Sequence, residues 1–269
     1  AHAAGLCAEH GVDRAIVVTA DGTGYGPDGT VWGGEVLDVR YADFERVGGL
    51  GSFSLPGSRT AVEYPARVLA SLLDTPIVEE RLVETGAVDS RKEAAVVRQQ
   101  AERGINAPTT TSAGRVLDAV SALVGACDRR TYEGEPAQRL EALATSGTVE
   151  PIDLQYRSSD GRRVLDTHAL VSDLADMLTR QSAADVAATA QVALARGLGT
   201  LAVEAASERG VQTVGFTGGV AYNDAISRQL REVVTDAGLT LLTPAAVPPG
   251  DGGIAYGQAI VASARSTTR

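Results

Sequence analysis

The sequence predicts a mixed α/β fold: a mixed sheet with a large helical insertion between its strands. Three observations support this prediction. Short β-rich runs follow one another between residues 14 and 47, whereas the chain from about 58 to 210 has mainly helical patterns. From residue 211 onward, strand, glycine turn and helix alternate twice, which predicts parallel strands joined by right-handed crossovers.

Composition and charge limit the possible functions. The 269 residues suffice for one large domain or two small ones, and 44% hydrophobic residues with only 4% aromatics predict an aliphatic core. No apolar run reaches membrane-spanning length and no secretory signal is visible, so we expect a cytoplasmic protein without a membrane partner. The net charge of −10 argues against nucleic acid as a partner.

The two cysteines, Cys7 and Cys127, do not form a metal-binding or redox motif. Both lie in alanine-rich helical contexts, without CxxC spacing. We therefore expect buried thiols and not catalytic groups.

Local patterns place the elements in chain order. The first is a helix from residue 1 to about 10, followed by Gly11, which favours the left-handed conformation found after helices. Strands are predicted at Arg14–Ala20, Thr30–Val39, Ala42–Val47, Val211–Phe216 and Leu239–Thr243, with a hairpin around 158–161 and a glycine-dense loop at 48–57. Helices are predicted at Thr60–Asp74 with a break at Pro65, Ser90–Arg103, Ala113–Val124, 132–144, His168–Gln181, Ala183–Glu208, Ala221–Ala237 and Ile254–Ala264.

His2 lies near the start of the first helix, which begins without a capping residue. We therefore expect the chain to be a piece of a longer protein. In that case His2 would share a helical face with a residue four positions upstream, and two histidines at that spacing are common metal ligands. As a lone histidine, it would more commonly lie on the surface or in the core.

Asp21 follows the first predicted strand and opens the glycine-rich segment Asp21–Gly26. Because Asp28-Gly29 is a strong hairpin signal, we expect Asp21 at the mouth of a tight turn between two paired strands. Glycines there let backbone N–H groups approach a ligand, and a carboxylate beside them suits a metal-bound phosphate. Taken alone, the segment is equally compatible with an ordinary hairpin loop.

Two later glycine turns each follow a strand and open a helix. At Thr217-Gly218-Gly219, backbone N–H groups and the positive helix end favour an anion. Asn223 lies one turn further on and either binds a ribose or base or lies on the helix surface. Asp251 either caps its helix or joins Asp21 in a site for iron, manganese, magnesium or zinc.

Two further helix starts carry polar residues and glycine. Gly114 lies early in a helix beside Ser112, Arg115 and Asp118. Glycine costs about 1 kcal/mol there relative to alanine, which indicates close packing or a ligand. Glu133 precedes another helix, where an acid either compensates the helix dipole or binds a ribose.

The order of elements resembles one ribonuclease-H-like lobe of the actin-like ATPase (ASKHA) superfamily, in which ligands gather at the carboxyl ends of the strands. A more specific resemblance rests on a set of motifs in a fixed order: Ala1-His2, Asp21–Gly26, Asp28–Glu35, Leu55–Gly57, Thr111–Arg115, Tyr132–Ala137, Thr217–Val220 with Asn223, and Pro248–Gly253. These motifs resemble those of the hydrogenase maturation carbamoyltransferases, the HypF family. One departure is Ser58, where a second glycine is expected after Gly57.

The resemblance implies a domain division and a set of site residues. Residues 1–11 would be the last helix of a first lobe, and 12–269 the second lobe with its helical insertion at about 58–210. His2, Asp21 and Asp251 would hold a divalent metal, with iron, magnesium or zinc expected. Asp21, Thr23 and Tyr25 would be catalytic. The residues expected to bind ATP, AMP or carbamoyl adenylate are Gly22, Gly24, Ser112, Gly114, Arg115, Asp118, Glu133, Gly218, Gly219 and Asn223.

The resemblance also implies a reaction and partners. In HypF enzymes an acylphosphatase domain hydrolyses carbamoyl phosphate and a YrdC-like domain adenylates the carbamate. The domain that this chain resembles then passes the carbamoyl group to the C-terminal cysteine of HypE, for the cyanide ligands of nickel–iron hydrogenase. Two alternatives stay open: a tRNA-modifying or antibiotic carbamoyltransferase of the same superfamily, and a non-catalytic nucleotide-binding fragment that only docks HypE.

Overall fold

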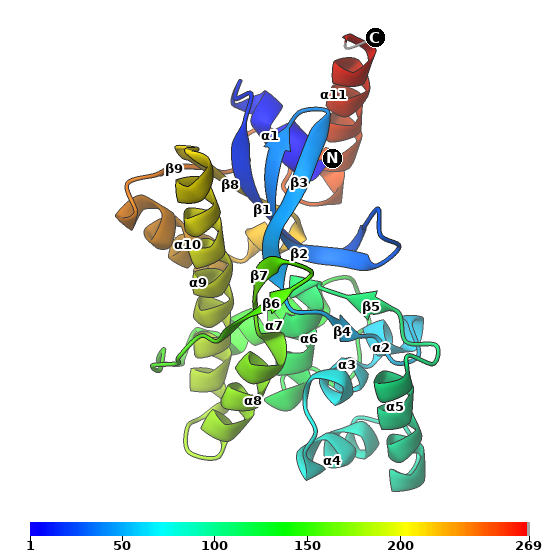
Figure 1. Cartoon of the computed structure of the whole chain (residues 1–269). Coiled ribbons are helices and arrows are strands. Elements are labelled where there is room, and N and C mark those ends of the chain that lie inside the picture. The colour runs from blue at the N-terminus through cyan, green and yellow to red at the C-terminus, as the bar shows by residue number, and fades with distance from the viewer. Residues whose placement is uncertain (268–269) are drawn as a thin grey trace.

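A mixed sheet organises residues 1–267, the part of the chain that the computed structural model describes (Figure 1). Its nine strands include a path in the order β6-β7-β3-β2-β1-β8-β9, and β5 pairs with both β2 and β4 beside that path. The strands are β1 (Ala15–Tyr25), β2 (Val31–Arg40), β3 (Asp43–Leu50), β4 (Phe53–Ser54), β5 (Thr109–Thr110), β6 (Tyr156–Ser159), β7 (Arg162–Leu165), β8 (Thr213–Thr217) and β9 (Thr240–Leu242).

Strand directions change at the centre of the sheet. β1, β2 and β3 form an antiparallel meander, as the sequence predicts. On its other side β1 pairs in parallel with β8, from Ile16 opposite Val214 to Thr19 opposite Thr217, and β8 pairs in parallel with β9. The predicted parallel pairing of the late strands is therefore confirmed, and it brings both ends of the chain together.

The helical insertion forms most of the lower part of the molecule in Figure 1. Local chemistry explains its boundaries: Pro65 separates the first two of its helices, and Ser182 with Asp185 forms a capping box at the start of the longest one. The helices are α1 (His2–Glu9), α2 (Arg59–Glu63), α3 (Pro65–Leu72), α4 (Pro76–Glu84), α5 (Arg91–Arg103), α6 (Ala113–Leu123), α7 (Glu135–Ala144), α8 (Thr167–Leu178), α9 (Ala183–Arg209), α10 (Asp224–Asp236) and α11 (Ile254–Thr267), with 3₁₀ turns at Gly219–Tyr222 and Asp251–Gly253.

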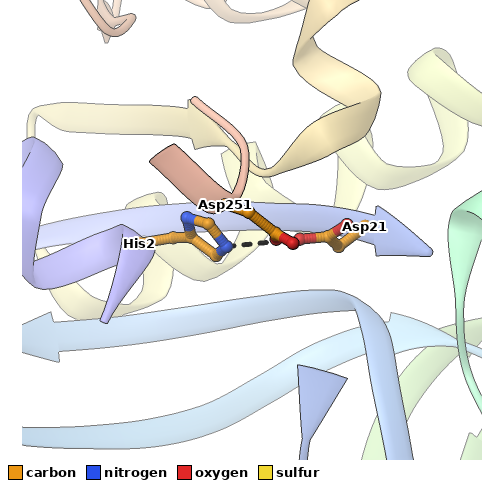
Figure 2. A group of neighbouring side chains, drawn as sticks. All are labelled: His2, Asp21 and Asp251. Atoms are coloured by element: carbon orange, nitrogen blue, oxygen red, sulfur yellow. Dashed lines mark ion pairs between the residues drawn. The ribbon is translucent and has the colours of Figure 1, made fainter. Parts of the chain in front are cut away.

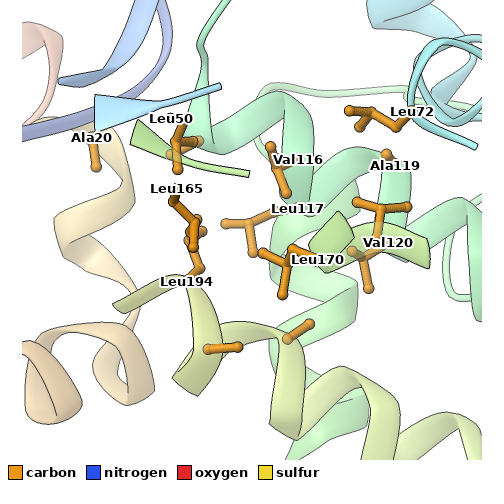
Figure 3. Close-up of a cluster of buried hydrophobic side chains, with 14 of the residues drawn as sticks. Ala20, Leu50, Leu72, Val116, Leu117, Ala119, Val120, Leu165, Leu170 and Leu194 are labelled. Carbon is orange, nitrogen blue, oxygen red and sulfur yellow. The ribbon is translucent and has the colours of Figure 1, made fainter. Parts of the chain in front are cut away.

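The core is aliphatic and lies on both faces of β1. Ile16 and Val18 point into the main cluster, which α6, α8 and α9 share, whereas Val17 points to a second cluster with Leu6 of α1. Figure 3 shows side chains from the sheet and the helices meeting in the main cluster. This alternation along one strand places β1 between α1 on one face and the helical insertion on the other.

Helix α9 is long and apolar enough to cross a membrane, judged by length and composition. This differs from the expectation that no segment reaches such a length. However, 78% of its apolar window is buried inside the protein, so its composition is explained by its place in the core.

Two local predictions are wrong. The glycine-dense loop expected at 48–57 is partly strand, because β3 continues to Leu50 and β4 follows. Gly49 lies where a Cβ atom would be 2.5 Å from the Gly34 carbonyl oxygen, so this glycine permits close strand packing. The helix expected from Ala221 begins at Asp224 after a 3₁₀ turn.

Two further features of the fold are not predicted from the sequence. They are helix α4 and the pairing of β7 with β3.

Ser58, which follows Gly57 where a second glycine is expected, has a strained backbone. Its backbone has φ 52° and ψ −107°, and its side chain does not cap the helix that follows. Such a conformation costs a residue other than glycine about 1–3 kcal/mol. The expected glycine would suit this position, whereas serine is strained there.

We predict that Ser58→Gly raises the free energy of unfolding by about 1 kcal/mol, because relief of strain outweighs the greater freedom of glycine in the unfolded chain. Urea unfolding followed by circular dichroism measures the change. The same substitution at Ser207, exposed in α9, is the control and should lower stability by about 0.5 kcal/mol. A destabilising Ser58→Gly would contradict the strain argument.

Candidate functional site

Asp21 lies at an irregularity in β1 and not in the hairpin turn. The strand continues to Tyr25, and its register with β2 shifts between Ala20 and Gly24. The turn itself is further along, closed by a 3.0 Å hydrogen bond from Gly26 N–H to the Thr30 carbonyl. This corrects the predicted position: the glycines let the strand bulge at Asp21 before the hairpin closes.

The start of helix α6 packs against the backbone of this bulge. The Ser112 hydroxyl lies 2.7 Å from the Asp21 carbonyl oxygen and 2.9 Å from that of Gly22, and it caps the helix by accepting from Arg115 N–H. A Cβ atom on Gly114 would lie 2.8 Å from the Gly22 Cα atom. Ser112 and Gly114 therefore let the start of α6 contact the bulge backbone directly.

Buried Glu35 fixes the strand opposite the bulge. Its carboxylate accepts hydrogen bonds from Gly33 N–H at 2.7 Å and Gly34 N–H at 2.8 Å, and it pairs with Arg46 at 3.1 Å. The guanidinium of Arg46 lies 4.6 Å from the centre of the Trp32 ring. Glu35 thus braces the hairpin, since its buried carboxylate is bound by two backbone N–H groups and by the side chains of Arg46 and Thr111.

Three side chains from distant parts of the chain meet above the bulge (Figure 2). His2 comes from the first turn of α1, Asp21 from β1, and Asp251 from the 3₁₀ turn before α11. His2 Nε2 lies 3.2 Å from Asp21 Oδ2, and the ligand-type atoms of all three residues lie within 4.8 Å of one another. One imidazole and two carboxylates are donors that manganese, iron, zinc and magnesium accept.

The Asp21 carboxylate is held in its charged form. Burial alone would raise its pKa, but hydrogen bonds from His2, Gly22 N–H and Gly219 N–H outweigh burial and lower the pKa below its ordinary value. Gly22 N–H donates at 2.7 Å. At neutral pH this group is therefore an anion facing His2 and Asp251.

The turn after β8 reaches the same point because of Gly218. Its φ is 102°, and a Cβ atom there would lie 2.2 Å from the Ala20 carbonyl oxygen. The following residue, Gly219, lies next to the Asp21 carboxylate, where a Cβ atom would be 3.1 Å from Oδ1. This corrects the predicted α-helical start, since a 3₁₀ turn comes first and brings Gly219 to Asp21.

A cavity of about 370 Å³ opens beside these groups, a volume typical of small-ligand sites. It is bounded by the bulge, α6, the start of α7 and both 3₁₀ turns. The predicted site residues that line it are Asp21, Gly22, Gly114, Arg115, Asp118, Glu133, Gly219, Asn223 and Asp251. The cavity residues that the sequence predictions did not include are Leu117, Gly134, Ala137, Gln138, Glu141, Val220, Tyr222 and Gly250.

Three of the eight missed residues had a usable signal in the sequence. Gly134, Gln138 and Glu141 lie three or four residues apart, on one face of a helix that follows Glu133. That spacing points to all three in the sequence. Gln191 does not line the cavity, but it supports the lining from α9 by accepting a 2.6 Å hydrogen bond from the Asn223 amide, and no sequence pattern indicates this contact.

Six predicted residues lie outside the cavity lining. His2 contacts Asp21 without lining the cavity, and Thr23, Gly24 and Tyr25 lie at the far end of β1, where Tyr25 is 96% exposed. The catalytic roles of Thr23 and Tyr25 and the nucleotide contact of Gly24 stay predictions. Ser112 and Gly218 are buried, and the backbone contacts described above explain both residues without a direct nucleotide contact.

Buried polar side chains form part of the cavity wall, and each is held by hydrogen bonds within the protein. Arg115 is buried, donates to the carboxylate of buried Asp118, and places its Nε 3.2 Å from the Gly22 carbonyl. Asn223 caps α10 by accepting from Ile226 N–H at 2.9 Å. Contrary to the surface alternative, Asn223 is buried. These polar groups are therefore held in place before any ligand binds.

Comparisons with known proteins show what this arrangement is similar to. Residues 17–258 match the family model described as "Carbamoyltransferase, Kae1-like Domain, second subdomain". The chain is 38% identical over 264 residues to the probable carbamoyltransferase HypF of Methanocaldococcus jannaschii, covering 97% of this chain and 34% of that protein. It is 37% identical over 280 residues to the carbamoyltransferase HypF homolog of Cupriavidus necator, covering 99% of this chain and 70% of that protein.

A solved structure shows the same architecture. Full-length HypF in the phosphate- and nucleotide-bound form matches with a TM-score of 0.89 and 30% sequence identity, covering 98% of this chain and 35% of that one. The chain thus spans about a third of the length of the M. jannaschii relative and of this structure.

The support that α6 gives the bulge leads to a prediction. Gly114→Ala should lower the free energy of unfolding by about 1–3 kcal/mol, because the new methyl group would overlap the Gly22 backbone. Helix propensity alone predicts the opposite sign. Thermal and urea unfolding measure the change.

Gly5→Ala in α1 is the matched control. The nearest atom to a Cβ there is 3.4 Å away, an ordinary contact distance, so this variant should be neutral or stabilised by up to about 1 kcal/mol. Equal effects at the two glycines would contradict the close approach of α6 to the bulge.

Proposed function

The chain belongs to the HypF family of carbamoyltransferases, and from this premise we propose that its cavity binds carbamoyl adenylate and passes the carbamoyl group to a cysteine of HypE. We propose further that the sheet and its insertion are the second ribonuclease-H-like lobe of an ASKHA fold. Because the chain spans only part of its relatives, the whole activity, its substrates and its partners are proposals for this chain.

The observation that carries the proposal is the convergence of His2, Asp21 and Asp251 at the edge of the cavity. Beside them lie glycine N–H groups from the bulge and the turn after β8. The N–H groups of Gly22 and Gly219 bind the Asp21 carboxylate. Because neither glycine carries a side chain, the phosphate of an adenylate would lie against their backbone next to that carboxylate, with its ribose and base toward α6 and α7.

The donor set fits a divalent metal. His2, Asp21 and Asp251 would hold it, and the lowered pKa of Asp21 keeps that carboxylate deprotonated at neutral pH. When bound, the ion would supply Lewis-acid chemistry, polarising the carbamoyl carbonyl or neutralising the phosphate. The residues themselves orient the donor: Asp21 is fixed by Gly22 and Gly219, so the charged groups need little rearrangement on binding.

We propose that the acceptor thiol lies outside this chain. Both cysteines of this chain are buried, and burial raises the pKa of Cys7 to about 11 and also raises the pKa of Cys127. The HypE thiolate is the nucleophile that we propose. A carbon–sulfur bond forms to the carbonyl carbon as the carbon–oxygen bond to AMP breaks, and AMP leaves with that electron pair.

We propose that acylphosphatase and YrdC-like domains of the full enzyme supply the adenylate. The carbamate formed by the first of these domains is consumed by the second, so carbamoyl adenylate is the species that this cavity would receive. The non-catalytic alternative differs in one measurable way: it predicts nucleotide binding without transfer.

The transfer reaction tests the proposal. The chain is mixed with carbamoyl adenylate and HypE, and mass spectrometry follows thiocarbamate on the HypE cysteine. We expect transfer by the wild-type chain and a loss on the order of 100-fold or more for Asp21→Asn, which removes the central charge. Asp43→Asn, a similar change at an exposed position of β3, should retain the wild-type rate.

Two results would count against this function. Nucleotide binding without transfer would support the non-catalytic alternative, and transfer to tRNA or a sugar in preference to HypE would support another carbamoyltransferase. Equal rates for Asp21→Asn and Asp43→Asn would remove Asp21 from the reaction.

Metal binding provides a separate prediction. Asp251→Ala should weaken Mn²⁺ binding about 10-fold or more, because one of two carboxylate donors is lost. Isothermal titration calorimetry measures the dissociation constant, and Asp236→Ala at the exposed end of α10 is the control. An unchanged constant for Asp251→Ala would show that this residue is not a ligand.

A further inference from the structure

Glu9 joins the two elements that carry His2 and Asp251. It lies in the last turn of α1, the helix in which His2 is the first residue. Its Oε1 atom accepts hydrogen bonds from three consecutive backbone N–H groups, those of Ala245 and Val247 at 3.1 Å each and that of Ala246 between them. Four residues after Val247 the chain reaches Asp251. One carboxylate thus connects the helix of one proposed ligand with the loop of another.

This loop has few other ways to hold its position. Residues 243–250 belong to no helix or strand, and three of them, Pro244, Pro248 and Pro249, lack an N–H donor. The Pro249 carbonyl accepts a 2.9 Å hydrogen bond from Gly218 N–H, and His10 Nε2 lies 2.9 Å from the Thr243 carbonyl. Neither of these contacts involves residues 245–247. Glu9 is therefore the side chain that connects this part of the loop to α1 by hydrogen bonds.

The second oxygen of Glu9 lacks such an explanation. Oε2 is buried and has no hydrogen-bond partner among the residues that the structure describes. Glu9 and His2 also line the same small cavity of about 10 Å³, together with Pro248. Leaving a buried carboxylate oxygen unpaired is costly, so Glu9 is held in place by the hydrogen bonds of Oε1 and not by those of Oε2.

The negative charge of Glu9 strengthens its hydrogen bonds to the loop. Burial alone would raise its pKa, but the three backbone N–H groups outweigh burial and lower it, so the group is an anion at neutral pH. Hydrogen bonds to a charged acceptor are stronger than those to a neutral one.

We propose that Glu9 is a positioning residue of the metal site, which sets the place of Asp251 relative to His2 without being a ligand. This inference rests on the proposed function, since it assumes that the three residues bind a divalent cation. Outer groups that orient metal ligands commonly contribute 10–100-fold to affinity.

The test is Mn²⁺ binding to the full chain, measured by calorimetry and by the electron paramagnetic resonance of free Mn²⁺. Glu9→Gln keeps the size of the side chain and one acceptor oxygen but removes its charge. We expect its Mn²⁺ affinity to fall about 10-fold or more while circular dichroism shows a folded protein. Glu9→Asp keeps the charge on a shorter side chain and should give an intermediate affinity; it serves as the test variant if Glu9→Gln does not fold.

His10→Ala is the matched control, because it removes a contact with the same loop away from residues 245–247. It should lower the melting temperature without changing Mn²⁺ affinity. The inference would be overturned if Mn²⁺ affinity fell in both Glu9→Gln and His10→Ala, and fell in proportion to the drop in each melting temperature. That result would indicate a merely structural role for Glu9.

The remaining outcomes separate this inference from the metal site itself. Binding that Asp251→Ala weakens and Glu9→Gln does not would overturn the inference alone. No Mn²⁺ binding by the wild-type chain would overturn the proposed metal site, and this inference with it.

Discussion

The close approach of two backbones, at Ala20 and Gly218, is the constraint on which the rest of the site depends. Parallel pairing of β1 with β8 ends at Thr19 opposite Thr217, and beyond that pair one chain bulges while the other enters a 3₁₀ turn. A side chain on Gly218 would overlap the Ala20 carbonyl. Because none is present, Gly219 meets the Asp21 carboxylate, and a cavity with N–H groups on its wall forms between the diverging chains.

Other elements stabilise this junction from two sides of the sheet. On one face Ser112 and Gly114 of α6 contact the bulge backbone, and buried Glu35 binds the strand opposite. On the other face α1 contributes His2 to the site and uses Glu9 to hold the loop before Asp251. Arg115 and Asn223 are held by buried partners, Asp118 and Gln191, before a ligand arrives, which lowers the reorganisation needed on binding.

The sequence predicted what depends on short-range chemistry. Capping residues and apolar spacing placed most helices, and glycine turns after strands located Asp21, Gly219 and Asp251, which do meet. What it did not predict depends on contacts between distant segments. The bulge at Asp21 needs α6 beneath it, and β7 joins the sheet only by pairing with β3. Glu9 likewise shows no pattern in sequence, since its partners lie more than 230 residues away.

In the site that we propose, one metal and one nucleotide share the space between Asp21, Gly219 and Asp251. Crystals of the chain grown with Mn²⁺ and a non-hydrolysable ATP analogue would locate both, the metal through the anomalous scattering of manganese. We expect one strong anomalous peak bounded by His2, Asp21 and Asp251, with a phosphate group next to it at Gly219. A peak elsewhere, or a nucleotide bound away from this cavity, would rule out this site.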